Sequence, residues 1–521
     1  MTEAVTTKIT AAVIDIGSSA IRMIVAELGT KEEIRQLENL QKPIRLGKDV
    51  FINGRIGNNV MHEAVEILKN YKSVATGYGV KKIQTIATSA VREATNRDMF
   101  LDQVFVRTGL DIEVLEGPEE NRLELIAVES ALGTEFDLEK KNCLIVEVGS
   151  GGTEMIVLNQ GKVEVTRSLS IGSIRLPEQS VAGKTLLADM QRILKRSIRE
   201  VASYVATECS LDQVDVFIGL GADMRFVARQ LCTEPPERFS VLEKKAFENF
   251  VSKLSKKTAE EITQEFGMTY TEAETLYPSL LFYDYFLAET KSEQVVIPMT
   301  SIRDALLLEM AQMISGYKRT DLSKQVLNSA RHLGEKFHYD KGHGLVSASL
   351  SIRLFDLLQS DHGMGSRERL LLEVAALLHD IGTYISTTSH NKHSSYMINA
   401  SEIFGLRKSD KDIVANVVRY HRRSPPKPTH MEYMSLLRND RAVVSKLAAI
   451  LRVADALDRS HKQKIKSFSL ERVKQGYVLW VPEEAGDVSI EKAALQEKSD
   501  MFLENFGIPI TLKQGTPPPE K

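Results

Sequence analysis

The pattern of apolar and polar positions over the first third of the chain is typical of an α/β domain. Apolar runs rich in β-branched residues alternate with segments of helical periodicity. The predicted strands are 10–16, 21–28, 81–87 and 112–115, and the predicted helices are 57–76, 96–108 and 118–132. Gly17-Ser18-Ser19 lies between the first two strands, so we expect a hairpin there.

The same pattern begins again near residue 143. Ile14-Asp15-Ile16-Gly17-Ser18 aligns with Val146-Glu147-Val148-Gly149-Ser150, 132 positions further along. The second copy is predicted to hold strands at 143–148, 154–158, 162–171 and 214–219 and a helix at 184–206. A repeat of this length indicates a duplicated domain, whose halves would present their glycine turns to a shared cleft. A chance likeness between two common turns is the alternative.

The remaining chain is first helical and then mixed. Residues 240–318 are predicted to be mostly helical, and residues 324–461 helical throughout, because apolar residues recur there at i, i+3 and i+4. A β pattern returns after 463, with strands at 468–473, 476–481 and 508–512 and a helix at 490–504. We therefore predict four domains, at 1–133, 134–318, 319–462 and 463–521.

Composition narrows the class of protein. The chain is 43% hydrophobic and 26% charged, which is ordinary for a globular protein, and its net charge of −3 excludes a generally basic nucleic-acid-binding surface. The three cysteines form no CxxC pair, which favours a reducing compartment. We see neither a signal peptide nor an apolar stretch of membrane-spanning length. A cytoplasmic protein without a membrane or nucleic-acid partner is expected.

The two glycine turns carry the first candidate chemistry. Backbone N–H groups and small hydroxyls in such turns form anion sites suited to phosphate. Asp15 and Glu147 end the first strand of each hairpin, and Glu154 follows the second turn. Because carboxylates repel phosphate, their presence indicates a divalent cation, Mg²⁺. Tight structural turns are the alternative.

Two further segments follow predicted strands. Thr88-Ser89-Ala90-Val91-Arg92 opens a helix, where N-terminal amides and Arg92 could bind an anion, although an ordinary helix cap would look the same. Gly117-Pro118-Glu119-Glu120 also opens a helix. A carboxylate at the end of a strand could orient or deprotonate an attacking water, or could simply be an acid favoured by the helix dipole.

Several segments in order resemble the exopolyphosphatase/guanosine pentaphosphate phosphohydrolase (Ppx/GppA) family. They are 13–28, 85–92, 115–123, 145–158, 171–176 and 217–225. The resemblance implies a fold of duplicated α/β actin-like (ribonuclease H-like, ASKHA) domains. An all-α HD-like domain and a small α+β domain would follow these. It also implies a homodimer and Mg²⁺-dependent hydrolysis of terminal phosphoanhydrides.

The resemblance also implies residue roles. Glu120 matches the general base, and Asp15, Glu147 and Glu154 the Mg²⁺ ligands. The expected phosphate-binding residues are Gly17, Ser18, Ser19, Thr88, Ser89, Arg92, Gly149, Ser150, Gly151, Gly152 and Thr153. The chain departs from the family at Glu147, where the family usually has Asp, and at Gly149-Ser150-Gly151-Gly152-Thr153, where it usually has Gly-Gly-Gly-Ser-Thr.

Four functions remain open at this point. Inorganic polyphosphate is the leading substrate, and guanosine pentaphosphate is the alternative. A phosphate-ligand sensor without catalysis is a third hypothesis, because the second loop is altered. A kinase is a weaker rival, since its adenosine loop would correspond only to Gly219-Leu220-Gly221-Ala222.

Histidines are concentrated in one part of the chain. Ten of the eleven lie between 332 and 461: His332, His338, His343, His362, His379, His390, His393, His421, His430 and His461. The adjacent His379-Asp380, with His343 and Asp455 on other predicted helices, resembles the ligand pattern of HD phosphohydrolases. This implies a possible second divalent-metal site in the HD-like domain. Capping or core histidines are the alternative.

Overall fold

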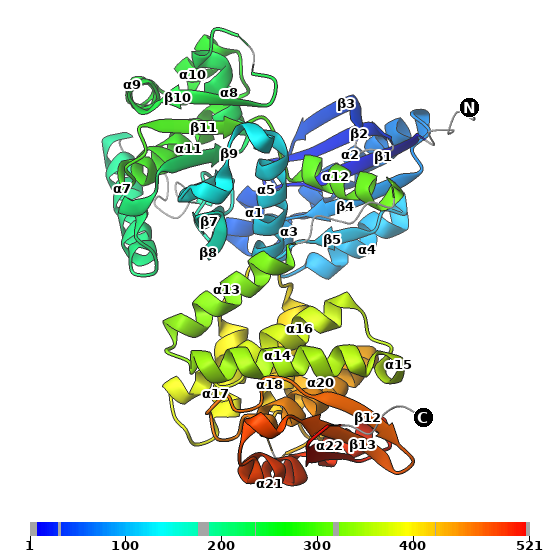
Figure 1. Ribbon diagram of the computed structural model, residues 1–521. Helices are drawn as coiled ribbons and strands as arrows, with labels where there is room; N and C mark the ends of the chain where they lie inside the picture. Colours follow the sequence, from blue (N-terminus) through cyan, green and yellow to red (C-terminus); the bar gives the residue numbers. More distant parts are fainter. Residues whose placement is uncertain are drawn as a thin grey trace, which may run out of the picture. The chain divides into compact units, whose positions relative to one another are not determined.

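The computed structural model describes residues 8–29, 33–175, 187–234, 236–315, 322–422 and 424–516, which form two compact units divided at residues 321 and 322 (Figure 1). The first unit contains two α/β lobes, each with its own sheet, which we call lobe I and lobe II. The second unit contains a helical bundle and a small sheet.

Lobe I has a five-stranded sheet in the order β3-β2-β1-β4-β5. The strands are β1 (Ile9–Ile16), β2 (Ala20–Leu28), β3 (Ile34–Pro43), β4 (Lys82–Ala87) and β5 (Ile112–Val114). The helices are α1 (Leu46–Asn53), α2 (Asn58–Gly77), α3 (Ser89–Glu93), α4 (Arg97–Thr108) and α5 (Gly117–Leu132). The apolar sides of α2 and α4 pack on the sheet through residues such as Leu68 and Phe100. The predicted hairpin is β1–β2.

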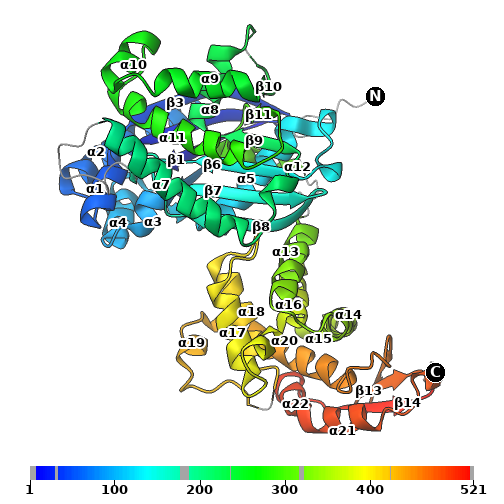
Figure 2. The same ribbon diagram turned by 90° about the vertical axis from the view of Figure 1, so that its left-hand side faces the viewer.

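Lobe II has a six-stranded sheet in the order β10-β11-β9-β6-β7-β8. The strands are β6 (Cys143–Val148), β7 (Thr153–Asn159), β8 (Lys162–Leu169), β9 (Val216–Leu220), β10 (Phe239–Glu243) and β11 (Gln294–Pro298). Its helices are α7 (Leu187–Ala206), α8 (Ala222–Leu231), α9 (Lys244–Leu254), α10 (Ala259–Phe266) and α11 (Tyr270–Ala288). Figure 2 shows α7 and α11 along one face of this sheet, where both contribute to the apolar core.

The internal repeat is confirmed by strand register. Asp15 pairs with Arg22 across the β1–β2 hairpin, and Glu147 pairs with Glu154 across β6–β7. Equivalent cross-strand positions therefore hold a cation in lobe I and a carboxylate in lobe II. The two lobes use one hairpin design with opposite charge at this position.

Two helices tie the lobes together. α5 packs against β7 and β8 of lobe II, and α12 (Ile302–Ser315) packs against α5 and against β1 and β2 of lobe I. The prediction of a mostly helical segment at 240–318 missed β10 and β11. The run Val295-Val296-Ile297 is a short, fully buried strand between long helices, and its local pattern does not distinguish strand from helix.

The second unit begins with the predicted helical region. Its helices are α13 (Ser323–Lys336), α14 (Lys341–Leu357), α15 (Gln359–His362), α16 (Ser366–Leu378), α17 (His390–Ala400), α18 (Lys408–Arg419), α19 (Met431–Met434) and α20 (Arg438–Leu457). The sheet β12 (Ser469–Val473), β13 (Gly476–Val481) and β14 (Ile510–Gln514) follows. One apolar core includes residues of both the bundle and the sheet, so the two are continuous.

The helix predicted at 490–504 is wrong in one respect. The structure has two helices, α21 (Ser489–Lys498) and α22 (Asp500–Phe506), with Ser499 ending the first and preceding the second. A serine followed by an aspartate favours a new helix start, and the local sequence therefore interrupts the apolar periodicity. Among the described residues, no helix is both long enough and apolar enough to cross a membrane.

Candidate functional site

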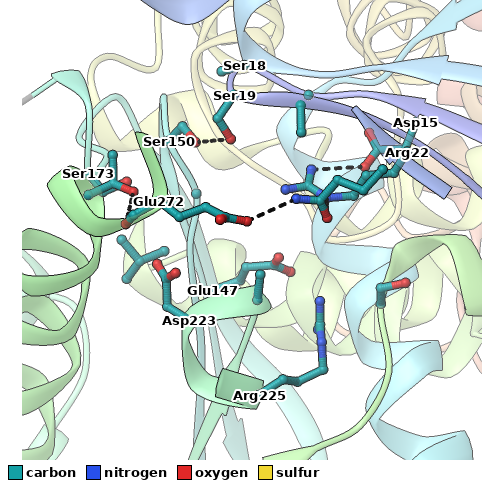
Figure 3. Close-up of a pocket in the computed structure, with 18 of the residues that line it drawn as sticks. Asp15, Ser18, Ser19, Arg22, Glu147, Ser150, Ser173, Asp223, Arg225 and Glu272 are labelled. Carbon is teal, nitrogen blue, oxygen red and sulfur yellow. Dashed lines mark hydrogen bonds and ion pairs between the residues drawn. The ribbon is translucent and has the colours of Figure 1, made fainter. Parts of the chain in front are cut away.

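A cleft of about 570 Å³ lies between lobe I and lobe II. Both hairpin turns, the start of α3 and the first turns of α5 contribute to its walls. Figure 3 shows Asp15, Ser18, Ser19 and Arg22 from lobe I opposite Glu147, Ser150, Ser173 and Asp223 from lobe II. The predicted cleft between duplicated halves is therefore present.

The two hairpin turns touch each other. The Ser150 hydroxyl donates a hydrogen bond to Ser19 Oγ at 2.9 Å, and the Ser18 and Ser89 hydroxyl oxygens are 3.0 Å apart. Gly151 approaches Ser89 so closely that a Cβ atom built on it would lie 2.5 Å from Ser89 Oγ and 2.3 Å from Phe51 Cζ. Only glycine fits this contact, which brings the three serine-bearing segments together.

The turn glycines and Thr153 also have structural tasks. The Gly17 amide donates to the Ala20 carbonyl at 3.1 Å, and the Gly149 amide donates to the Gly152 carbonyl at 2.8 Å, so these bonds close the two turns. Thr153 is fully buried and donates its hydroxyl to the Ile171 carbonyl at 2.7 Å. Of the predicted phosphate-binding set, all residues line the cleft except Gly151 and Thr153.

Arg92 and Glu120 lie together in the cleft. Arg92 donates to the Leu115 carbonyl at 2.6 Å and forms an ion pair with Glu120, while Thr88 lines the cleft beside it. Burial is the largest influence on Glu120 and raises its pKa, although the Arg92 charge acts in the opposite direction. A carboxyl whose pKa is raised above its usual value is better suited to act as a general base.

Five carboxylates, counting Glu120 itself, gather in this part of the cleft. They are Asp15, Glu120, Glu124, Glu147 and Glu154, all of which line the cleft. Burial raises the pKa of Asp15, and Arg22 and Arg303 oppose that change. Burial also raises the pKa of Glu147, which is hydrogen-bonded to Glu124. Carboxylates this close together repel one another, and a divalent cation between them would offset that repulsion.

Neutral donors hold Glu154 in place. Its Oε2 atom accepts a hydrogen bond from Ser168 Oγ at 2.5 Å and another from Asn121 Nδ2 at 3.1 Å. The neighbouring Arg122 points away from the cleft, into a buried ion-pair set with Glu119 and Glu309. In the segment Glu120-Asn121-Arg122, the first two residues therefore serve the cleft, and the third joins α5 to α12.

Sequence reasoning missed several charged residues of this cleft, among them Arg22, Arg225, Arg303 and Glu124. Arg22 lies 3.9 Å from Asp15, and Arg225 and Arg303 also line the wall. The repeat gave a signal for Arg22, because it occupies the position equivalent to Glu154. Glu124 could have been found from its spacing, since a residue four positions after Glu120 shares its helix face. No local signal marks Arg225 or Arg303.

One end of the cleft is less polar. Phe226, Phe266, Met268 and Leu276 line it together with Asp223. The Phe226 and Phe266 rings pack edge to face with centroids 5.4 Å apart. Burial raises the pKa of Asp223 to about 6, which Ser279 and nearby arginines partly offset. This end could contact a flat apolar group as well as an anion.

A second cluster of ionisable groups lies in the helical bundle. The predicted His343, His379, Asp380 and Asp455 converge there, and His390 and His421 join them. His343 Nε2 lies 3.1 Å from His379 Nε2 and 3.6 Å from Asp455 Oδ1. His390 Nε2 lies 3.1 Å from Asp380 Oδ1. The ligand atoms form three groups, each compact enough to surround one metal ion.

Backbone carbonyls orient two of these imidazoles. His379 Nδ1 is 2.8 Å from the Ala376 carbonyl, and His421 Nδ1 is 2.6 Å from the Val418 carbonyl. This arrangement directs Nε2 toward the cluster, as in many metal sites. Burial lowers the pKa of His379 to about 4, so it is neutral near pH 7, the form that binds a metal. Lys498 from α21 forms an ion pair with Asp455.

Most other histidines of the block lie elsewhere. His362 is a buried core residue whose Nε2 lies 2.8 Å from the Phe355 carbonyl. His430 contacts Tyr420. His461 stacks on His343 at the edge of the cluster, with ring centroids 3.8 Å apart, but belongs to none of the three ligand groups. The high histidine content therefore overstates the number of possible ligands.

Comparison with known proteins identifies the family. The model of the Ppx/GppA phosphatase family matches residues 24–313, and the model of Ppx/GppA phosphatase domain III matches residues 327–497. The chain belongs to the Ppx/GppA phosphatase family. The predicted family resemblance and the prediction of a hydrolase are thus confirmed.

Relatives in this family match nearly the whole chain. The guanosine-5'-triphosphate,3'-diphosphate pyrophosphatase of Photobacterium profundum is 22% identical over 480 residues, which is 90% of this chain and 91% of the relative. A protein of the same name from Aliivibrio fischeri is 21% identical over 87% of each chain.

The crystal structure of an exopolyphosphatase from Cytophaga hutchinsonii matches 59% of this chain and 99% of its own, with 20% identity and a TM-score of 0.54. The predicted duplicated actin-like fold is confirmed.

Proposed function

We propose that this chain is a Mg²⁺-dependent hydrolase that removes the terminal phosphoryl group of inorganic polyphosphate as orthophosphate. The observation that carries the proposal is the position of Glu120, partly buried in the cleft beside Arg92 and facing two hairpin turns that touch through Ser19 and Ser150. Phosphoryl transfer requires mainly positioning and charge stabilisation, and this arrangement supplies groups for both.

The neutral, basic and acidic residues of the cleft would have different roles in the reaction. The hydroxyls of Ser18, Ser19 and Ser150 and the backbone of their turns would hold the oxygens of the terminal phosphoryl group. Arg92, whose guanidinium contacts Glu120 in this structure, would turn its free N–H groups to the same oxygens. Release from Arg92 would let Glu120 accept a hydrogen bond from the attacking water and orient it.

The acids of the cleft fit a divalent cation. Asp15 is 8% exposed, and its Oδ1 atom has no hydrogen-bond partner among the described residues. Asp15 and Glu147, with Glu154 nearby, would hold Mg²⁺, as hard oxygen ligands do. The bound cation would neutralise charge on the phosphate oxygens. Glu147 has a longer side chain than the aspartate that the family usually has at this position. Glu124 and Asp15 both affect the pKa of its carboxyl group.

Guanosine pentaphosphate is a second candidate substrate. Full-length relatives carry a name for that activity, and the Phe226 and Phe266 end of the cleft offers a surface on which a base could stack. Phe266→Ala should weaken catalysis on guanosine pentaphosphate about tenfold or more and leave polyphosphate turnover nearly unchanged. An equal effect on both substrates would remove the stacking argument.

The experiment that tests the activity measures orthophosphate release. Wild type and Glu120→Gln would be compared on polyphosphate and on guanosine pentaphosphate, each with and without Mg²⁺. Release by wild type alone, and only with Mg²⁺, supports the proposal. Binding of either ligand by wild type without release would instead favour a sensor. Glu129→Gln, on the same helix but outside the cleft lining, is the matched control.

A specific observation favours a metal site in the second unit as well. Six side chains converge there, and backbone carbonyls orient two of them. We propose that one or two divalent metal ions bind to His343, His379, Asp380 and Asp455, with His390 and His421. The purified chain should then contain metal that Asp380→Asn loses and that His362→Gln, the control in the core, retains. Equal metal content in all three would contradict the site.

We also propose that the chain works as four domains, 1–133, 134–318, 319–462 and 463–521, the third of them HD-like. The two separate sheets of the first unit and the bundle and small sheet of the second support these divisions. The homodimer and the cytoplasmic location stay predictions.

A further inference from the structure

Glu124 is the acid of the cleft to which no role has yet been given. It lies on α5, four residues after Glu120, so both side chains project from the same helix face into the cleft. Glu124 is only 3% exposed, and its Oε2 atom has no hydrogen-bond partner among the described residues. A buried carboxylate oxygen without a partner is costly, so this atom has a strong tendency to bind a cation.

The Glu124 side chain also interacts with that of Glu147. The two side chains are hydrogen-bonded, which requires that they share a proton. Burial, followed by the charges of Glu147, Glu154 and Glu120, raises the pKa of Glu124 well above its usual value. Two carboxyl groups in contact at low exposure are compatible either with this shared proton or with a cation between them.

The basic residues nearby are used elsewhere. Arg92 is paired with Glu120, and Arg122 with Glu119 and Glu309. Within the part of the chain that the structure describes, neither Glu124 nor Glu147 forms an ion pair with lysine or arginine, although Arg225 exerts a longer-range attraction on Glu147. The side chains of the protein therefore leave the charge of this pair largely uncompensated.

We propose that Glu124 is a direct ligand of the divalent cation in this cleft, beside Glu147 and Asp15. The inference rests on the proposed Mg²⁺-dependent function and adds a carboxylate to its metal site. Three oxygen donors from three elements, α5, β6 and β1, would then surround the ion, and two of them have an unpartnered buried oxygen in this structure. Ligands of this kind suit Mg²⁺ and Mn²⁺.

A purely structural role for Glu124 makes a different prediction. If Glu124 only braces Glu147 by donating its proton, then a glutamine at this position could replace it, because an amide also donates a hydrogen bond. If Glu124 binds the ion, then Glu124→Gln removes a negatively charged ligand of nearly the same shape. The same substitution therefore separates bracing from metal binding.

The test measures Mn²⁺ binding by isothermal titration calorimetry and by electron paramagnetic resonance, without substrate. All chains would carry Asp380→Asn, so that the histidine cluster contributes as little as possible. Glu124→Gln should weaken Mn²⁺ binding about tenfold to 100-fold or more, by comparison with the loss of groups that support metal ligands. Glu129→Gln, on the same helix but away from the cleft, should leave the affinity unchanged. Glu124→Asp keeps the charge on a shorter arm and should give an intermediate affinity.

The outcomes separate this inference from the proposed function. Unchanged Mn²⁺ affinity in Glu124→Gln, with binding present in the unsubstituted background, overturns the role of Glu124 and leaves the proposed hydrolase intact. Absence of Mn²⁺ binding in the background overturns both the role of Glu124 and the cation site. Circular dichroism establishes that each variant is folded. If Glu124→Gln does not fold, Glu124→Asp decides, since wild-type affinity in that variant also argues against a ligand at this position.

Discussion

Arg122 offers a clear test of what holds the two lobes in position. It lies on α5 and is 7% exposed. Its Nε and Nη2 atoms donate to Glu119 at 2.9 Å each, and its Nη1 and Nη2 atoms donate to Glu309 of α12 at 2.6 and 3.2 Å. Burial disfavours the charge of Arg122, but these hydrogen bonds outweigh it and raise its pKa. The three charged residues are thus one buried unit.

Arg122→Met would keep much of the side-chain volume and remove the charge. It would leave Glu119 and Glu309 buried without the guanidinium between them. Removing one partner of a buried ion pair typically costs about 3–5 kcal/mol, whereas replacing a whole buried ionic set with neutral groups is often nearly neutral. We therefore expect Arg122→Met to lower the free energy of unfolding by roughly 3–5 kcal/mol. The triple variant Arg122→Met, Glu119→Gln, Glu309→Gln should recover most of that loss.

Urea unfolding followed by two signals measures this effect. Far-ultraviolet circular dichroism reports both units, whereas the fluorescence of Trp480, the single tryptophan of the chain, reports only the second unit. The circular dichroism transition should move in Arg122→Met, and the Trp480 transition should not. A loss smaller than about 1 kcal/mol, or a triple variant less stable than the single one, would refute the reasoning.

Three further predictions follow from the contacts around the cleft. Gly151→Ala would place a Cβ atom against Phe51 and Ser89, so we expect a loss of about 1–3 kcal/mol in unfolding free energy and slower phosphate release, measured by thermal melting and a phosphate assay. Burial raises the pKa of Glu129 to about 7, so its unfavourable ionisation lowers the free energy of unfolding as the pH rises from about 4.5 to 7. Glu129→Gln should therefore raise the free energy of unfolding by on the order of 1–3 kcal/mol at pH 8 and not at pH 4. An equal increase at both pH values would contradict this. The Tyr283 hydroxyl accepts from the Val148 amide at 2.8 Å and donates to the Leu220 carbonyl at 2.6 Å, so Tyr283→Phe should cost about 1–3 kcal/mol in urea unfolding, whereas no change would show that water replaces it.

Much of the cleft could be predicted from local sequence because its parts are repeated. The two hairpins share one pattern, and the glycine turns with their acids could be recognised before their contact through Ser19 and Ser150 was known. The position of Glu120 after a strand at the start of a helix left an ordinary first-turn acid open, and only the family resemblance implied its role. The same logic did not extend to Arg303, because it reaches the cleft from α12, which returns to lobe I from a distant part of the chain. Such a return is set by tertiary packing and leaves no local pattern.

The histidine block shows most clearly what composition alone does not predict. Ten histidines lie close together in sequence, but the bundle brings only some of them to one point. His379 and His421 reach it because each follows the last turn of a helix, where a backbone carbonyl fixes the ring. His362 also lies at the end of a helix, α15, and is part of the core instead. Helix packing makes that distinction, and the spacing of histidines along the chain does not.

The central claim is that Glu120 orients the attacking water, and orthophosphate release by Glu120→Gln tests it most directly. General-base groups typically contribute about 100-fold to 10,000-fold to the rate. We predict that Glu120→Gln lowers kcat on the preferred substrate by a factor in this range and leaves KM nearly unchanged, while the variant remains as stable as wild type. Turnover within about threefold of wild type would contradict the assignment of Glu120 and, with it, the proposed mechanism.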